Sequence, residues 1–85
     1  EIVESITRYV EDGVPTGGFL EAVLANDLRE SFGRADDDNR RALFAIVAYC
    51  YNEIPGDCWG SYERVSVWLA RHAEERKKRT DAPPL

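Results

Sequence analysis

Hydrophobic residues recur along the chain at the spacing of amphipathic helices. In the first segment Ile2, Ile6 and Val10 follow one another at intervals of four residues. This spacing places them on one stripe of a helix. Gly13 is suited to a left-handed C-cap, and Pro15 prevents the helix from continuing. We therefore predict a first helix that ends at Gly13.

The next apolar stripe is the longest and predicts the most buried surface of the protein. Its members are Phe19, Leu20, Val23, Leu24, Leu28 and Phe32. They keep one helical period throughout, so the pattern predicts a single helix over this whole stretch. Thr16 is the predicted N-cap of this second helix, and Gly33 its end.

A third helix is predicted to begin after Asp36, whose side chain can cap exposed amide groups. Its predicted inward residues are Leu43, Ile46, Val47, Cys50 and Tyr51. Alanines between them allow a neighbouring helix to approach closely, so we expect this to be the central helix. It should end near Asn52, because Pro55 biases the residue before it away from helical geometry.

The segment from Pro55 to Ser61 predicts a tight turn followed by a fourth helix. Within it, Trp59 is expected to fill the gap between the third and fourth helices, and Ser61 to cap the fourth. The predicted inward residues of that helix are Tyr62, Val65, Trp68, Leu69 and His72. The remaining chain is highly charged up to residue 79, which is typical of a solvated helical end.

These elements predict an all-α fold, a compact array of about four short helices in an orthogonal rather than a regular up-down arrangement. No stretch alternates with the period of a strand. We expect one helical domain over residues 1–79 and a disordered tail over residues 80–85. Eighty-five residues suffice for one core and leave little room for a large internal active site.

Charge is distributed unevenly along the chain. Residues 1–39 carry ten acidic side chains and three arginines, a net charge of −7, whereas residues 40–85 carry eight basic and six acidic side chains, a net charge of +2. An acidic protein of this kind makes a poor general nucleic-acid binder. Two cysteines do not form the disulfide framework of a small secreted domain, and no apolar run is long enough to span a membrane. We expect a cytoplasmic protein.

The residues that could carry chemistry do not form a recognisable catalytic or metal-binding pattern. Cys50, Cys58, Asp57 and His72 are the candidate ligands, but structural zinc sites use ligand pairs two to four residues apart. A disulfide between the cysteines and a thiol enzyme remain alternatives. The favoured interpretation is that both cysteines pack in the core, and that the protein has no metal, no cofactor and no enzymatic activity.

Two polar features remain. Asp27 falls at the edge of the second apolar stripe, where a carboxylate needs a partner; a structural hydrogen bond to a loop is the favoured role. Tyr49 lies opposite the apolar stripe of the third helix and is the predicted exposed aromatic residue. The predicted partner-binding residues are Asp36, Asp37, Asp38, Arg41, Tyr49 and Glu53.

The order and spacing of several short motifs resemble a group of small, mostly uncharacterised proteins encoded by bacteriophages, prophages and mobile elements. The resemblance covers nearly everything from Arg8 to His72. It rests on Gly17-Gly18-Phe19-Leu20, Ala22-Val23-Leu24, Asn26-Asp27-Leu28, Ala35-Asp36, Asn39, Tyr51-Asn52, Pro55, Cys58-Trp59-Gly60-Ser61, Val65 and Trp68-Leu69. It implies a setting, a small accessory protein made during infection, and assigns no role to any residue.

Small acidic proteins in that setting are often inhibitors of a host protein, including anti-defence proteins such as anti-CRISPRs; this step is an analogy. Our leading hypothesis is therefore a non-enzymatic protein that binds a host or defence-system protein stoichiometrically. The alternative is a small regulator that binds nucleic acid through Arg40, Arg41 and the basic end of the fourth helix, Arg76 to Arg79. A homodimer through the face of the third helix that carries Tyr49 is a further alternative.

Overall fold

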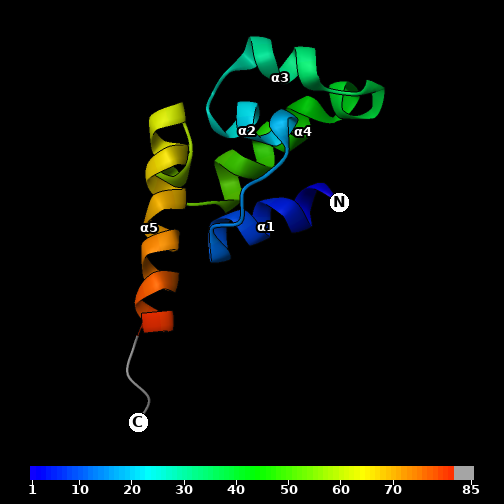
Figure 1. Cartoon of the computed structure of the whole chain (residues 1–85). Helices are drawn as coiled ribbons and strands as arrows, with labels where there is room; N and C mark the ends of the chain where they lie inside the picture. The colour runs from blue at the N-terminus through cyan, green and yellow to red at the C-terminus, as the bar shows by residue number, and fades with distance from the viewer. Residues whose placement is uncertain (82–85) are drawn as a thin grey trace.

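The structure is a computed structural model that describes residues 1–81. Within that range the chain consists of helices joined by turns and short irregular connections (Figure 1). The all-α prediction is confirmed, with five α-helices in place of about four. In chain order the elements are α1 (Ile2–Asp12), α2 (Gly18–Leu24), α3 (Leu28–Arg34), α4 (Asp37–Glu53), the 3-10 turn η1 (Gly56–Cys58) and α5 (Tyr62–Asp81).

The predicted second helix is in fact two helices, so that prediction was wrong. Asn26 adopts a left-handed conformation with φ of 60° and breaks the chain direction after α2. Asp27 then caps α3, because its side chain accepts a hydrogen bond from the backbone N–H of Glu30 at 3.1 Å. The break turns Leu28 and Phe32 away from the core, and both are more than half exposed.

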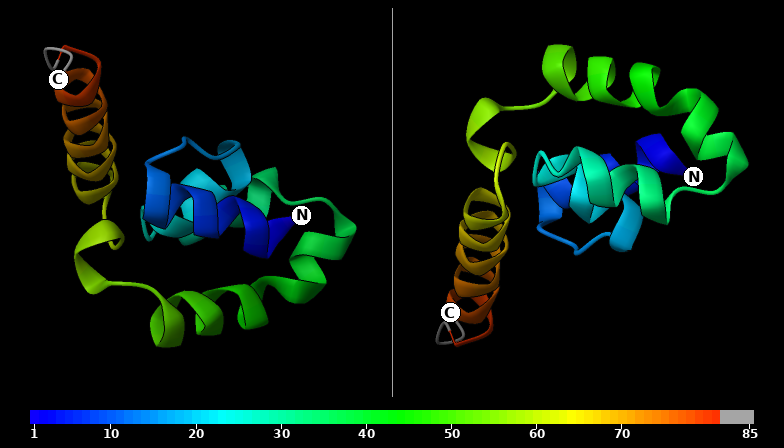
Figure 2. Two further views of the ribbon diagram at one scale, coloured as in Figure 1. Left: turned by 90° about the horizontal axis from the view of Figure 1, so that it is seen from below. Right: turned by 90° about the horizontal axis from the view of Figure 1, so that it is seen from above.

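The start of α2 also differs from the prediction. The N-cap is Gly17 and not Thr16, and no side chain caps this end. The buried residues of α2 are Leu20, Ala22, Val23 and Leu24. In both views of Figure 2, α2 lies among the other helices, so α2 rather than the predicted third helix holds the central position.

The helix predicted as central is α4, which contributes only Ile46 and Cys50 to the fully buried core. Its start was predicted correctly, because Asp36 accepts a hydrogen bond from the N–H of Asn39 at 2.8 Å. Val47 and Tyr51 were expected to point inward, but both are exposed. The short α3 and α1 cover the flanks of α4 incompletely, which leaves those side chains in solvent.

Two hydrogen bonds, one buried and one partly buried, hold α1 against the C-terminal part of the chain. The hydroxyl of Tyr9 donates to the carbonyl oxygen of Cys58 at 2.7 Å, and the indole N–H of Trp68 donates to the carbonyl oxygen of Tyr9 at 3.0 Å. Gly13 ends α1 as predicted, with φ of 64°, and its backbone lies directly against the side chain of His72. A glycine is required there for both reasons.

The turn before α5 agrees with its prediction. Gly60 has φ of 122°, and its N–H donates to the carbonyl oxygen of Leu24 at 2.7 Å, which ties the turn to the end of α2. The hydroxyl of Ser61 accepts a hydrogen bond from the N–H of Arg64 at 3.0 Å and caps α5. Trp59 packs half-buried against the core. This segment is a structural connection.

The helix α5 is the longest element, and its C-terminal half projects beyond the other helices (Figure 1). Val65, Trp68 and Leu69 contribute to the core as predicted, whereas Tyr62 is exposed. The helix includes residues 80 and 81, where the predicted tail begins; the rest of that tail, 82–85, lies outside the described residues. No helix among residues 1–81 is long and apolar enough to cross a membrane.

Candidate functional site

The acidic cluster predicted to bind a partner lies exposed at the start of α4, where two arginines pair with it. Asp37 contacts Arg40 at 3.3 Å, and Asp38 contacts Arg41 at 3.6 Å. These pairs are exposed, so each contributes little to stability. The two arginines therefore offset the charges of Asp37 and Asp38, and Asp36 is occupied as the helix cap.

Tyr49 was predicted to be the exposed aromatic residue of α4, and that was wrong. Its side chain is half-buried and packs against the core. The exposed aromatic side chains of α4 are Phe44 and Tyr51, at 88% and 78% of full exposure. The sequence pattern placed Tyr49 on the outer face because it assumed that α4 was central and buried on its other side.

Tyr49 instead forms part of a crevice between α1 and α4. Two hollows of about 280 and 130 Å³ make up the crevice. The larger is lined by Ile2, Val3, Ile6, Asn39, Ala42, Ala45, Ile46 and Tyr49. The smaller is lined by Ile6, Thr7, Val10, Glu11, Tyr49, Glu53 and Ile54. Ile6 and Tyr49 line both hollows, so the hollows adjoin one another.

The walls of the crevice are two helices that run in the same direction. Ile2 shares the first hollow with Asn39, near the start of each helix, and Val10 shares the second with Glu53, near the end of each. The left panel of Figure 2 shows α1 and α4 running in the same direction. The small side chain of Ala45, which is itself exposed, keeps the crevice wide on the α4 side.

Acidic side chains stand at both ends of this apolar crevice. Glu11 and Glu53 line its far end, and Asp38 precedes Asn39 at its near end. Of the predicted site residues, Tyr49 and Glu53 line the crevice. Asp38 lines neither hollow; its exposed side chain pairs with Arg41.

The two cysteine thiols are buried, so reagents in solution cannot reach them in the folded protein. Cys50 and Cys58 are both unpaired and fully buried, as the sequence interpretation expected. Burial raises the pKa of each thiol to about 11, and the thiol of Cys58 donates a hydrogen bond to the carbonyl oxygen of Pro55 at 3.0 Å. Within the described part of the chain, no group of three His, Cys, Asp or Glu side chains is placed to hold a metal ion.

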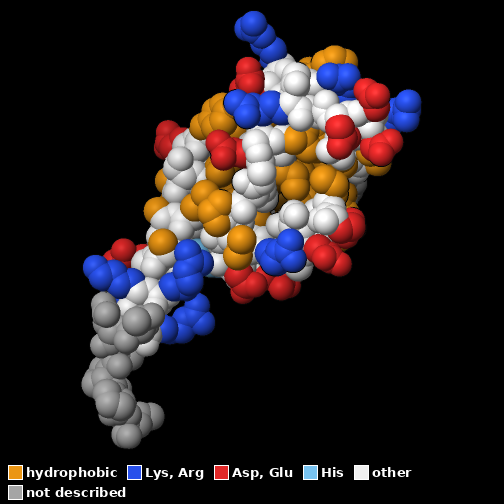
Figure 3. All heavy atoms as spheres, turned by 45° about the vertical axis from the view of Figure 1, so that its right-hand side comes forward, with side chains coloured by type: hydrophobic (Ala, Val, Ile, Leu, Met, Phe, Trp, Pro, Cys, Tyr) orange, Lys and Arg blue, Asp and Glu red, His pale blue; other side chains and the backbone are white. Residues whose placement is uncertain are grey.

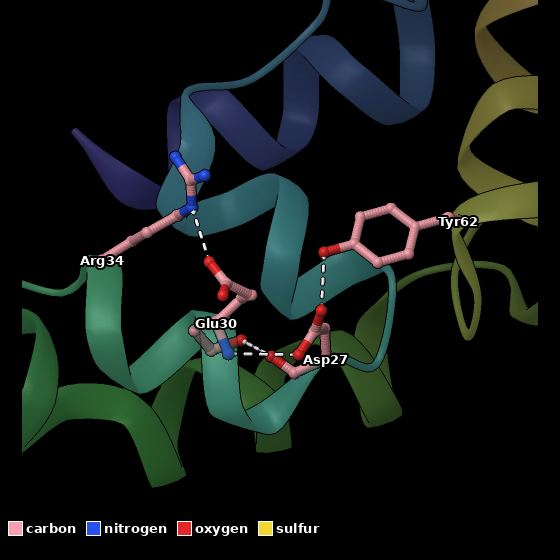
Figure 4. Close-up of polar contacts among 5 residues, drawn as sticks. Asp27, Glu30, Arg34 and Tyr62 are labelled. Atoms are coloured by element: carbon pink, nitrogen blue, oxygen red, sulfur yellow. Dashed lines mark hydrogen bonds and ion pairs between the residues drawn. The ribbon is translucent and has the colours of Figure 1, made fainter.

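Asp27 has the structural role that the sequence indicated. One carboxylate oxygen caps α3, and the other accepts a hydrogen bond from the hydroxyl of Tyr62 at 2.7 Å (Figure 4). These bonds, with the Tyr62 contact the largest, lower the pKa of Asp27. The same bond raises the pKa of Tyr62. The carboxylate thus joins α3 to α5 and does not point into either hollow of the crevice.

The basic residues proposed for nucleic-acid binding lie apart. Lys and Arg side chains gather around the C-terminal part of α5, beside the undescribed residues (Figure 3). Arg40 and Arg41 belong to the first turns of α4, at the opposite end of the molecule (Figure 1). Arg76 also donates a hydrogen bond to the carbonyl oxygen of Asp12 at 2.7 Å. The two basic groups do not form one face.

Comparisons with known proteins give no relative on which to transfer a role. No protein-family model, no curated protein and no solved structure matches the chain. The geometry of the crevice therefore carries the functional argument. Sequence reasoning did not predict the crevice: it selected Tyr49 as an exposed residue and missed the α1 wall, which includes Val3 and Ile6.

Proposed function

We propose that this chain is a non-enzymatic, phage-type accessory protein that binds another protein stoichiometrically, in the cytoplasm of an infected bacterium, through the crevice between α1 and α4. The single observation that carries the proposal is the crevice itself, two adjoining hollows between two parallel helices, the larger of them lined mostly by apolar side chains. Concave, mostly apolar sites are where proteins most often bind other molecules.

The shape of the crevice favours a helix as the bound element. The α1 wall has 11 residues, which corresponds to roughly 16 Å of helix. A depression of that length accommodates the apolar face of about three helical turns, with anchor side chains at intervals of three and four residues. The small Ala42 and Ala45 would allow the bound helix to approach α4 closely.

The charges at its ends favour a basic partner. Glu11 and Glu53 at one end, and Asp38 near the other, complement an amphipathic helix flanked by Lys or Arg residues. Complementary charges of this kind accelerate association and select among partners. A host or defence-system protein that presents such a helix is the proposed partner. This refines the predicted role of Asp38, Tyr49 and Glu53.

An affinity pull-down from bacterial lysate at physiological salt tests the proposal. The wild-type chain should recover a partner at a fixed stoichiometry. The variant Ala45→Trp, which fills the crevice from an exposed position, should lose that partner, and Ala70→Trp, which adds the same indole to an exposed position of α5, should retain it. Recovery that is equal with both variants, or absent with the wild type, would contradict the proposal.

The contribution of the acidic residues can be measured separately once the partner is purified. The double variant Glu11→Gln/Glu53→Gln should slow association and flatten its salt dependence, because the steering charge at one end of the crevice is removed. Changing the remote, exposed Glu75 to Gln provides the matched control. Unchanged kinetics in the double variant would show that the partner does not approach over this end.

A further inference from the structure

Five of the large apolar side chains that the fold leaves exposed belong to α3 and α4, and those of α4 lie on the side of the helix opposite the crevice. Leu28 and Phe32 are four residues apart on α3, and Phe44, Val47 and Tyr51 follow at intervals of three and four on α4. Each spacing keeps the side chains on one helical stripe. We refer to these five residues as the α3/α4 stripe.

The two halves of the stripe belong to antiparallel helices. At one end, the side chain of Arg40 donates to the carbonyl oxygen of Phe32 at 3.4 Å, and its guanidinium lies 5.3 Å from the centre of the Phe32 ring. At the other end, Tyr51 lines a hollow together with Asn26, which precedes α3. The right panel of Figure 2 shows α3 and α4 running in opposite directions. The two helices are thus close at both ends, and each leaves apolar side chains exposed to solvent.

The exposed area of the stripe is large for a protein of this size. Since an aromatic side chain buries about 150–250 Å² when fully covered, the five side chains together leave on the order of 600 Å² of mostly apolar surface in solvent. That lies at the upper end for a monomer, and a stable interface needs about 800 Å² on each partner. The stripe alone supplies most of that area.

We propose that a second copy of this chain covers the α3/α4 stripe, in a symmetric dimer whose two α4 helices cross antiparallel near Val47. A two-fold axis at that position brings Phe44 of one copy onto Tyr51 of the other, twice. Such an interface is self-complementary, as two-fold symmetry requires, because each copy supplies both members of the aromatic pair. The antiparallel arrangement also aligns the two helix dipoles favourably.

Charges at the two ends of the stripe fit this pairing. The N-terminal end of α4 carries Asp36 and Asp37, both exposed. The opposite end carries Arg64, which lines the same hollow as Tyr51 and donates hydrogen bonds to the carbonyl oxygens of Gly56 and Trp59. In the proposed dimer Asp36 and Asp37 of each α4, with Arg40 paired to Asp37, lie toward Arg64 of the other copy. The exposed apolar area is the main argument for a second copy.

The dimer leaves the proposed partner site accessible. The crevice uses Ala42, Ala45 and Tyr49 of α4, whereas the stripe uses Phe44, Val47 and Tyr51. These positions lie on different sides of the helix. Dimer formation and partner binding can therefore be tested independently of each other.

Sedimentation equilibrium of the full chain over a wide concentration range is the test. Wild-type protein should approach twice the 9.6 kDa mass of one chain. The variant Phe44→Ser should remain at the mass of one chain, and Val67→Ser, which alters an exposed valine of α5, should behave as wild type. A wild-type chain that stays monomeric, or a dimer that Phe44→Ser does not weaken, would overturn the proposal.

A cross-linking experiment covers the case in which Phe44→Ser fails to fold. Val47→Cys should form a covalent dimer under mild oxidation, because the two copies of residue 47 lie next to the proposed axis, whereas Val67→Cys should not. The native thiols of Cys50 and Cys58 are fully buried and would contribute little background. Equal cross-linking through positions 47 and 67, or none through 47, would contradict the proposed interface.

Discussion

The contact between the end of α1 and the middle of α5 yields a quantitative prediction for Gly13. A left-handed backbone costs a residue with a Cβ about 1–2 kcal/mol. In addition, a Cβ at Gly13 would overlap the side chain of His72. Overpacking of this kind typically costs a further ~1–3 kcal/mol. We therefore expect Gly13→Ala to lower the free energy of unfolding by about 2–5 kcal/mol.

Thermal unfolding followed by circular dichroism gives the measurement. For a domain of this length each kcal/mol corresponds to a shift in Tm of about 4–8 °C, so the variant should melt on the order of 10 °C or more below wild type. Gly33→Ala is the matched control, because Gly33 lies within α3 and a Cβ there would meet no atom within 4 Å. That variant should be stabilised by about 0.5–1 kcal/mol.

The two costs at Gly13 can be separated by changing His72. In a His72→Gly background the overlap disappears and only the backbone cost remains, so Gly13→Ala should then cost about 1–2 kcal/mol. If Gly13→Ala costs the same in both backgrounds, or is within 0.5 kcal/mol of wild type in either, the described packing of α1 on α5 is refuted.

Three further predictions concern hydrogen bonds and thiols. Tyr9→Phe should lower the free energy of unfolding by about 1–3 kcal/mol in denaturant titrations, because the buried carbonyl of Cys58 loses its donor; an unchanged midpoint would contradict the bond. The lowered pKa of Asp27 means that its contribution is complete above the ordinary pKa of about 4 and is lost as pH falls through the lowered folded value. Asp27→Asn should therefore flatten the acid side of the stability profile, and a variant that keeps the wild-type slope would exclude this group. Because burial raises the pKa of Cys50 and Cys58, both thiols should react with a thiol reagent at pH 8 only as fast as the protein opens; rapid labelling of the native protein would refute their burial.

Local signals in the sequence were sufficient to predict most helix ends. Asp36 and Ser61 cap α4 and α5, and Gly13 ends α1, because each of these ends depends on one side chain or one backbone conformation near it in the chain. The break between α2 and α3 was missed because the apolar spacing continues through it. Asp27 followed by Glu30 is a capping pattern that competes with that spacing, and here it prevails.

The candidate site depends on contacts that helical periodicity does not encode. Tyr49 and Glu53 belonged to the predicted site, but Tyr49 was selected as an exposed residue and not as part of a crevice. The opposite wall comes from Val3 and Ile6 on a helix more than thirty residues away, and only the folded arrangement shows that α1 runs parallel to α4. The exposure of Phe44 likewise follows from how little of α4 the short α3 covers.

The central claim is that the crevice between α1 and α4 binds the partner. Two-dimensional amide NMR of the labelled chain, titrated with the partner recovered in the pull-down, tests it most directly. If the crevice binds the partner, the largest chemical-shift changes should occur at residues of both walls, such as Val3, Ile6, Ala45 and Tyr49. Shifts confined to the basic end of α5, or to positions of the α3/α4 stripe, would contradict it.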